Sequence, residues 1–178
     1  SGPNGLIEHS EFFLYTAKDR EAVDACREKG YKFPQITGWI RANKNDFQLV
    51  KEMQLAETGI LTSVSDYHIF MKMNWNRKEA EAKYLEIVYA ALEAGITPRL
   101  HLEDITRADI YGFVVPFVQK LVRLQEETNK KIRLRLCDTM GYGIPYPMAS
   151  LPRSVPKLIR AIIDDAGMSG ENLEWHGH

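Results

Sequence analysis

Cysteine is scarce in this 178-residue chain: Cys26 and Cys137 are the only two, and they form no Cys-x-x-Cys pair. Two isolated cysteines argue against a disulfide-stapled scaffold and a cysteine-rich structural zinc site, and they are typical of a reducing compartment. No apolar stretch approaches the ~20 residues of a membrane span. The first ten residues lack the basic, apolar and small-residue order of a secretion signal. We therefore expect a cytoplasmic protein without a membrane partner.

An excess of either charge is also missing, because 23 Lys and Arg face 24 Asp and Glu, for a net charge of -1. Such a chain lacks the electrostatic signature of a nucleic-acid-binding protein. Its 44% hydrophobic and 26% charged residues are typical of a folded globular protein. No low-complexity segment or change of composition marks a linker. Residues 1–178 are therefore expected to form one domain.

Strand-like and helix-like stretches alternate along the chain. Strands are expected at 11–16, 34–42, 60–65, 98–106, 131–139 and 172–178. Helices are expected at 18–30, 45–59, 76–95, 111–129 and 151–167, several of them closed by a glycine. Alternation at this spacing predicts βαβ units and a parallel sheet.

Polar and apolar residues alternate within the strands that are expected late in the chain. Arg99, His101 and Glu103 share one strand face, and Leu100 and Leu102 share the other. An open doubly wound sheet buries both faces under helices, so its strands are apolar throughout. A barrel explains the alternation, because its outer face meets the helices and its inner face surrounds a site. A half-exposed antiparallel sheet shows the same alternation, but the long intervening helices argue against it.

The end of the chain carries a histidine pair. His176 and His178 are two residues apart on an expected strand, so both imidazoles point the same way. This spacing allows one metal ion to take two nitrogen ligands. The alternative is an ordinary exposed strand end.

Polar side chains also follow two other strands. His101 and Glu103 lie at the carboxyl end of the strand 98–106, where parallel barrels place catalytic side chains. Asp104 and Asp109 beyond them are interpreted as capping or ion-pairing residues. Thr139 ends the strand 131–139 before a Gly-rich turn and is a candidate for substrate binding.

Two nucleophile patterns are weighed and set aside. Ser63, Ser65 and His68 are close in sequence, but they lack the strand–turn–helix context of a hydrolase nucleophile. Cys137 has no activating base beside it in sequence.

Three segments together resemble one enzyme family. The segments are "HLEDITRAD", "LCDTMGYGIP" and "LEWHGH". Their order, spacing and placement at strand ends resemble those of the DRE-TIM metallolyases, the family of 2-isopropylmalate, homocitrate and citramalate synthases. The residues of these motifs most resemble the Re-citrate synthase branch of that family. The resemblance implies a (β/α)8 TIM barrel, of which this chain holds an incomplete piece covering about strands two to seven. It also implies that the protein is longer at both ends.

The resemblance assigns roles to individual residues. His176 and His178 match two metal ligands, and a third, an Asp on strand one, is absent from this chain. The ion is expected to be Mn2+, with Mg2+, Co2+ or Zn2+ as alternatives. Glu103 and His101 match catalytic positions. The residues that match substrate-binding positions are Arg99, Thr139, Glu11 and Arg41.

Two positions depart from the family pattern. His101 stands where the family commonly has Ser or Thr, so an imidazole contact replaces a hydroxyl contact. Gly59 stands where isopropylmalate synthases carry His, which argues against that activity. Arg99 matches an arginine of homocitrate synthases. A buried, unpaired Arg99 is costly unless the substrate brings a second carboxylate; the alternative is that it pairs with Glu103 or Glu174.

The resemblance implies a metal-dependent acyltransferase that catalyses a Claisen-type condensation of acetyl-CoA with a 2-oxo dicarboxylic acid. The expected acid is oxaloacetate, which would give citrate. Homocitrate synthase and 2-isopropylmalate synthase are alternatives within the family. A lyase like hydroxymethylglutaryl-CoA lyase and a non-catalytic barrel fragment that serves as a binding module are alternatives outside it. A homodimer or larger homo-oligomer is expected.

Overall fold

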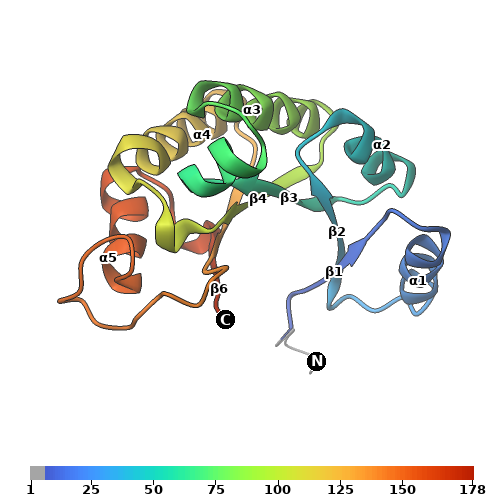
Figure 1. Ribbon diagram of the computed structural model, residues 1–178. Helices are drawn as coiled ribbons and strands as arrows, with labels where there is room; N and C mark the ends of the chain where they lie inside the picture. Colours follow the sequence, from blue (N-terminus) through green and yellow to red (C-terminus); the bar gives the residue numbers. More distant parts are fainter. Residues whose placement is uncertain (1–6) are drawn as a thin grey trace.

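The computed structural model describes residues 7–178, which form a parallel sheet of six strands in chain order. Figure 1 shows that the sheet curls and that the helices cover its convex side. The strands are β1 (His9–Phe13), β2 (Gln35–Arg41), β3 (Glu57–Ser63), β4 (Thr97–Glu103), β5 (Arg133–Cys137) and β6 (Leu173–His176). Neighbouring strands pair in parallel throughout. This architecture confirms the predicted incomplete (β/α)8 barrel.

The helices follow the strands in strict alternation. They are α1 (Ala17–Arg27), α2 (Lys44–Glu52), α3 (Arg77–Glu93), α4 (Val115–Thr128) and α5 (Val155–Arg160). Short π-helices are η1 (Tyr67–Lys72), η3 (Ile110–Val114) and η4 (Ala161–Asp165), and short 3-10 helices are η2 (Ile105–Arg107) and η5 (Gly170–Asn172). Residues 1–6, which include the start of the chain, lie outside the described residues, and the single-domain prediction for 1–178 stays a prediction.

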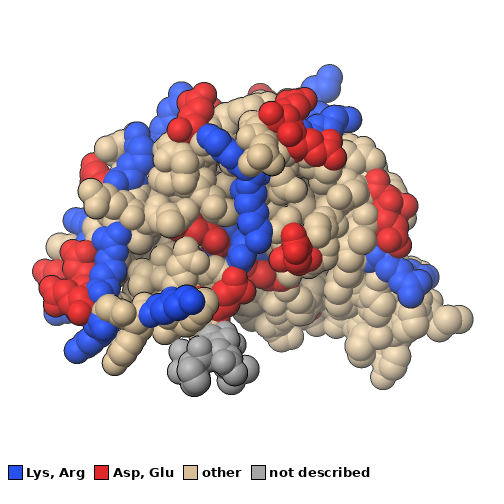
Figure 2. Space-filling model, turned by 180° about the vertical axis from the view of Figure 1, so that it is seen from behind, with Lys and Arg blue, Asp and Glu red and all other residues tan. Residues whose placement is uncertain are grey.

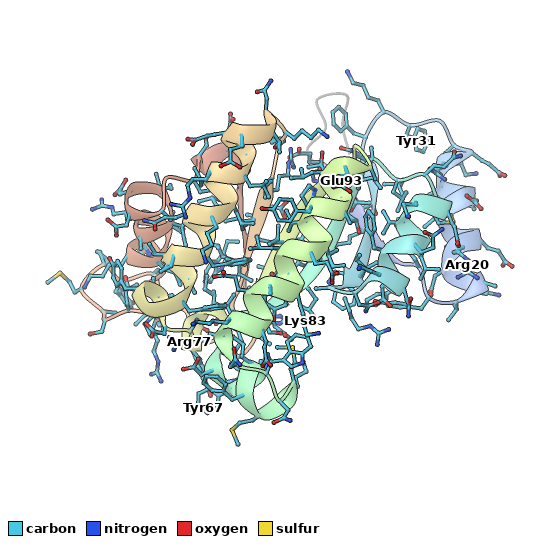
Figure 3. All side chains as sticks on the ribbon, turned by 90° about the horizontal axis from the view of Figure 1, so that it is seen from above. Arg20, Tyr31, Tyr67, Arg77, Lys83 and Glu93 are labelled. Carbon is cyan, nitrogen blue, oxygen red and sulfur yellow. The ribbon has the colours of Figure 1, made fainter. Side chains whose placement is uncertain are left out.

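The core lies between the sheet and the helices. Leu100 and Leu102 on the outer face of β4 are fully buried, and they belong to one apolar cluster with Tyr84 and Val88 of α3. Helix α3 begins with a capping box, in which Asn76 and Glu79 satisfy each other's backbone N–H groups. In Figure 3 this helix crosses the middle of the molecule, from Lys83 near its start to Glu93 at its end. The apolar faces of the strands therefore pack against the helices on the convex side, and the polar faces line the concave side.

One expected helix was wrong in its second half. The stretch 45–59 was expected to be helical to Gly59, but α2 ends at Glu52 and β3 begins at Glu57. Gln54 adopts a left-handed conformation, with φ of 50°, which a continuing helix does not tolerate. Gly59 is therefore a strand residue on the concave side rather than a helix stop.

The surface carries charged residues of both signs, as the near-neutral composition predicts. Figure 2 shows Lys, Arg, Asp and Glu interspersed on the face seen from behind. No helix within residues 7–178 is long and apolar enough to cross a bilayer.

Cys26 is exposed and Cys137 is buried, and both are free thiols. Burial raises the pKa of Cys137 to about 12, which agrees with setting it aside as a nucleophile.

Candidate active site

The concave face of the sheet is built from alternate strand residues. The register pairs Arg99 with Arg133, His101 with Arg135 and Glu103 with Cys137 across β4 and β5. Because side chains of paired positions point to the same face, polar residues of neighbouring strands meet inside the curl. Their contacts join all six strands. We call the six charged residues there the interior charge cluster: Glu11, Glu57, Arg99, Arg133, Arg135 and Glu174.

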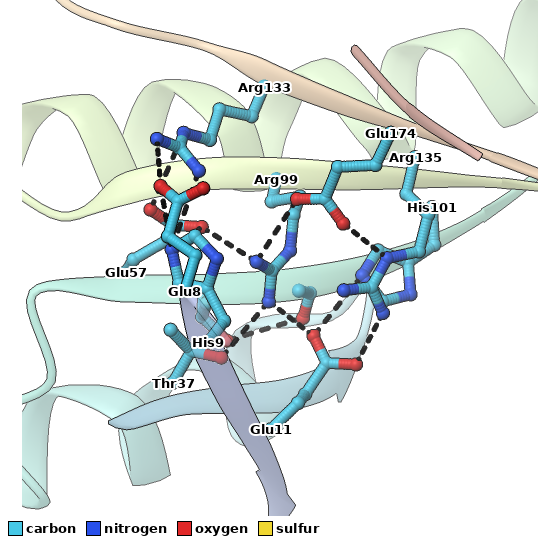
Figure 4. Close-up of polar contacts among 12 residues, drawn as sticks. Glu8, His9, Glu11, Thr37, Glu57, Arg99, His101, Arg133, Arg135 and Glu174 are labelled. Carbon is cyan, nitrogen blue, oxygen red and sulfur yellow. Dashed lines mark hydrogen bonds and ion pairs between the residues drawn. The ribbon is translucent and has the colours of Figure 1, made fainter. Parts of the chain in front are cut away.

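Arg99 is the centre of this cluster and is fully buried. Figure 4 shows its guanidinium surrounded by carboxylates from three other strands. Its Nη2 donates to Oε2 of Glu11 at 2.5 Å, and its Nη1 lies 3.0 Å from Oε1 of Glu57 and 3.3 Å from Oε1 of Glu174. Nη2 also donates to the Thr37 hydroxyl at 3.0 Å.

The premise that Arg99 lacks a partner in the protein is therefore wrong. The alternative of pairing with Glu174 is confirmed, whereas Glu103 makes other contacts. Three carboxylates already neutralise the guanidinium, so its burial by itself does not require a substrate carboxylate.

Glu11 links Arg99 to a second arginine. Arg135 donates to Oε1 of Glu11 at 2.8 Å through Nη1 and to Oε2 of Glu174 at 2.8 Å through Nε. Burial opposes ionisation of Glu11, but the nearby His101 imidazole and the two guanidinium groups outweigh it and hold the pKa of Glu11 at about 2. Glu11 is therefore a carboxylate at neutral pH, suited to orienting cationic or N–H groups rather than to proton transfer.

His101 is buried beside Glu11. Its Nε2 lies 3.3 Å from Oε2 of Glu11, outside hydrogen-bonding alignment, and has no hydrogen-bond partner within residues 7–178. Burial lowers the pKa of His101, with the nearby carboxylate of Glu11 opposing the shift. The ring is therefore neutral at pH 7 and has one nitrogen free to bind a polar atom.

Gly59 makes room for this imidazole. A methyl group on Gly59 would come within 2.6 Å of both Nε2 of His101 and Oε2 of Glu11. The two positions that depart from the family pattern, Gly59 and His101, are thus neighbours in the structure. The absence of a side chain at Gly59 on β3 leaves room for the imidazole of His101 on β4.

The first prediction tests this fit. Gly59→Ala should reduce the free energy of unfolding by about 1–3 kcal/mol, the usual cost of overpacking, because Glu11 is held by two arginines and His101 is buried. Thermal or urea unfolding measures it. Gly170→Ala is the control, because its methyl group would meet nothing closer than Ile163 at 3.5 Å. Equal stability of the two variants would contradict the tight fit.

Glu103 lies at the carboxyl end of β4, apart from the interior charge cluster. Its carboxylate accepts a hydrogen bond from the Ser63 hydroxyl and contacts His68 and Lys72. Ser63 ends β3, and the other two partners follow it on η1, so the end of one strand and the segment after it hold the side chain at the end of the next strand. The sequence patterns did not identify His68 as part of this site, because it was judged only as a hydrolase base.

Thr139 lies in the loop after β5, and its hydroxyl oxygen accepts a hydrogen bond from the backbone N–H of Asp104 at 2.9 Å. The hydroxyl hydrogen remains available as a donor. Asp138 beside it accepts from Thr106 and from the backbone of Tyr142 and Gly143. Asp138 thus holds the Gly-rich turn in place, and Thr139 is the residue with a free group.

Arg41 lies at the rim of the site. Its guanidinium donates to both oxygens of Asp46, at 2.8 and 3.1 Å, and its side chain is 64% exposed. It lines a pocket of about 630 Å³ together with Ser63 and Lys72, two neighbours of Glu103. The structure thus places Arg41 in a pocket that reaches Ser63 and Lys72, outside the interior charge cluster.

His176 and His178 lie at and just beyond the end of β6, with ring centroids 4.9 Å apart. Burial, followed by the neighbouring His178, lowers the pKa of His176, and a neutral imidazole is the form that binds metal. Within residues 7–178 no group of three or more His, Cys, Asp or Glu side chains is arranged to hold an ion. The pair therefore fits two positions of a ligand set, and other donors would complete it.

Four further cluster residues were not among the predicted site residues: Glu57, Arg133, Arg135 and Glu174. Glu57 was not recognised because the stretch 45–59 was expected to be a helix. The other three stood on the polar faces of expected strands, and that alternation was the available signal. Their pairing depends on strand register, which alternation by itself does not give.

Comparison with known proteins finds similar sequences along nearly the whole chain. The chain is 62% identical over 177 residues to the "Citrate (Re)-synthase" of Syntrophus aciditrophicus, covering 99% of this chain and 28% of the relative. It is 53% identical over 175 residues to the "Citrate (Re)-synthase" of Clostridium kluyveri, covering 98% of this chain and 39% of the relative. The chain thus spans well under half of the length of these relatives.

A solved structure supports the fold. The HMG-CoA lyase of Bacillus subtilis superposes with a TM-score of 0.63 at 18% identity, covering 99% of this chain and 57% of that one. The family profile described as HMGL-like matches residues 7–178. Together with the parallel half-barrel and its polar concave face, this match shows that the chain belongs to the HMGL-like family.

Proposed function

We propose that the full-length protein condenses acetyl-CoA with oxaloacetate to form citrate, as an acyltransferase of the Re-citrate synthase type. The observation that carries this proposal is the identity of 62% and 53% to two proteins of that name over nearly the whole chain. The residues of the concave face support it, because charged and polar groups rather than an apolar side-chain pocket line the interior. The expected cytoplasmic location and homo-oligomer stay predictions.

The division of roles follows from position. Glu103 is the proposed acid–base group, because its carboxylate lies at the carboxyl end of β4 next to the rim pocket of Arg41. That pocket is the proposed entry for acetyl-CoA. His101 is the proposed second catalytic group, since its Nε2 has no hydrogen-bond partner within residues 7–178 and can turn to an oxygen of the oxo acid.

The remaining predicted residues bind or orient the oxo acid in this proposal. Thr139 offers its hydroxyl hydrogen to a carboxylate, and Arg41 stands at the rim. Glu11 holds Arg99 and Arg135 in place. Arg99 and its neighbour Arg135 are proposed to bind the second carboxylate of the substrate, which would compete with Glu11 and Glu174 for the two guanidinium groups.

A divalent ion fits this site through His176 and His178, with Mn2+ expected before Mg2+, Co2+ or Zn2+. When bound, such an ion supplies Lewis-acid polarisation of a carbonyl group. The chain contributes two imidazoles at and just beyond the end of β6, with ring centroids 4.9 Å apart.

The second prediction tests those ligands. His176→Ala and His178→Ala in the full-length protein should each weaken Mn2+ binding by more than the ~10–100-fold known for outer-shell changes, because each removes a direct donor. Isothermal titration calorimetry measures the affinity. His9→Gln is the control, because His9 contacts Glu8 and Glu57 instead. Wild-type affinity in both alanine variants would rule out the assignment.

The proposed activity is tested with three oxo acids. Purified full-length protein is supplied with acetyl-CoA and Mn2+ and with oxaloacetate, 2-oxoglutarate or 2-oxoisovalerate, and CoA release and products are measured. The proposal expects citrate from oxaloacetate as the preferred reaction. A preference for 2-oxoisovalerate, or cleavage without condensation, would overturn it.

A further inference from the structure

His68 lies between two carboxylates at the carboxyl end of the barrel. Its Nδ1 is 3.0 Å from Oε2 of Glu103, and its Nε2 is 3.9 Å from Oδ2 of Asp104. The side chain is 17% exposed. In Figure 3, its neighbour Tyr67 lies at the same end of the molecule as Arg77, where α3 begins. The imidazole therefore connects the segment after β3 to the end of β4.

Two serines place the carboxylates on either side of the ring. The Ser63 hydroxyl donates to Oε2 of Glu103, and the Ser65 hydroxyl donates to Oδ2 of Asp104 at 2.5 Å. Ser65 also fixes His68 itself, because its carbonyl oxygen accepts from the backbone N–H of His68 at 3.1 Å. The spacing of Ser63, Ser65 and His68, which does not suit a hydrolase, suits this arrangement.

The two carboxylates differ in what else they bind. Asp104 is fully buried and accepts three hydrogen bonds from Arg107, at 2.7 to 3.0 Å. Its charge is met by that guanidinium, and the 3.9 Å to His68 is too long for a hydrogen bond. The one hydrogen bond that the His68 ring makes in this cluster therefore goes to Glu103, and it requires the proton on Nδ1.

Both donors act on the same oxygen of Glu103. The Ser63 hydroxyl and Nδ1 of His68 meet Oε2, whereas Oε1 lies 3.6 Å from the ammonium group of the half-exposed Lys72. A carboxylate held by one donor can still turn about its last bond. Two donors on one oxygen restrict rotation of the group and leave Oε1 on the side of Lys72.

We propose that His68 is a positioning residue for Glu103: its Nδ1–H, together with the Ser63 hydroxyl, holds the carboxylate so that Oε1 performs the proton transfer. This inference rests on the proposed function, in which Glu103 is the acid–base group. It adds a residue that acts through Glu103 and does not touch the substrate.

Substituting His68 with asparagine or glutamine distinguishes the role of Nδ1 from that of Nε2. The amide nitrogen of Asn occupies nearly the place of Nδ1, and that of Gln reaches the place of Nε2. In the full-length protein, His68→Gln and His68→Ala should lower kcat by on the order of 10²-fold, the effect of misplacing a catalytic group by about 1 Å. His68→Asn should retain most of kcat, and the KM for oxaloacetate should stay within about twofold in all three, because substrate contacts are intact.

The control is Met71→Ala, since Met71 lies on the same π-helix and its side chain points into solvent at 82% exposure. It should keep wild-type kcat. Equal losses in His68→Asn and His68→Gln, or an unimpaired His68→Ala, would overturn the positioning role.

Crystal structures of the variants make the test independent of turnover. Glu103 should keep its place in His68→Asn and rotate in His68→Ala. An unmoved Glu103 in His68→Ala would refute the inference even if the wild-type protein made no citrate. Absence of citrate from the wild-type protein would refute the proposed function alone.

Discussion

Glu103→Gln in the full-length protein should lower kcat by about 10²–10⁴-fold, the range that a general acid–base group supplies. Glutamine keeps the size of the side chain and can still accept the hydrogen bond from the Ser63 hydroxyl. It cannot exchange a proton at the operating pH. The loss corresponds to ~3–5 kcal/mol of transition-state stabilisation.

Steady-state kinetics with acetyl-CoA and oxaloacetate measures this change. The KM for oxaloacetate and the melting temperature should change little, because the contacts of Glu103 are with Ser63, His68 and Lys72 and not with the core. Glu81→Gln on α3 is a matched control, since Glu81 pairs with Lys120 on the outer helices. Turnover near the wild-type rate in Glu103→Gln would remove Glu103 from the catalytic set.

Arg99→Leu should lower the free energy of unfolding by about 3–5 kcal/mol, the cost of breaking a buried ion network by removing one partner. The leucine would leave Glu11, Glu57 and Glu174 facing one another with less positive charge between them. Because proteins are stable by only ~5–15 kcal/mol, this variant should be poorly folded. A kinetic test of Arg99 by deletion would therefore report folding rather than substrate binding.

Urea denaturation of Arg99→Lys and Arg99→Leu distinguishes the effect of the positive charge at this position from the effect of the shape of the guanidinium group. Arg99→Lys keeps the charge but cannot reach all three carboxylates, so its loss should be smaller than that of Arg99→Leu. Arg27→Leu serves as the surface control, since the Arg27 side chain contacts Asp24 and the carbonyl oxygen of Gln54 in exposed positions, and it should change stability by no more than ~0.5 kcal/mol. Similar stability of Arg99→Leu and wild type would show that the interior charge cluster does not support the fold.

The same cluster sets an expected pH dependence. The folded-state pKa of Glu11, about 2, is depressed from its ordinary 4.5. A depressed carboxyl pKa contributes stability that is fully present above the unfolded value and is lost as the pH falls toward the folded value. The contribution of Glu11 should thus disappear between about pH 4.5 and about 2. In Arg99→Lys the stabilising contacts are fewer, so acid unfolding should begin at a higher pH.

The sequence by itself determined the architecture. Six alternating strand and helix patterns predicted the parallel sheet, and the division of Arg99, His101 and Glu103 from Leu100 and Leu102 predicted a polar concave face. These patterns are local, because the direction of a side chain follows from its place in the strand. The resemblance of three strand-end motifs identified the family in the same way, from short segments at the carboxyl ends.

Only the tertiary structure decided which charges meet. Glu11 and Arg99 are 88 residues apart, and Arg99 and Glu174 are 75 apart, so their pairing depends on the register and curl of the sheet. The structure placed Glu57 in β3 instead of α2, joined Gly59 to His101, and put His68 beside Glu103. These contacts arise because parallel strands bring residues from successive βα units to one edge and one face, and no local pattern in the chain encodes the distances between them.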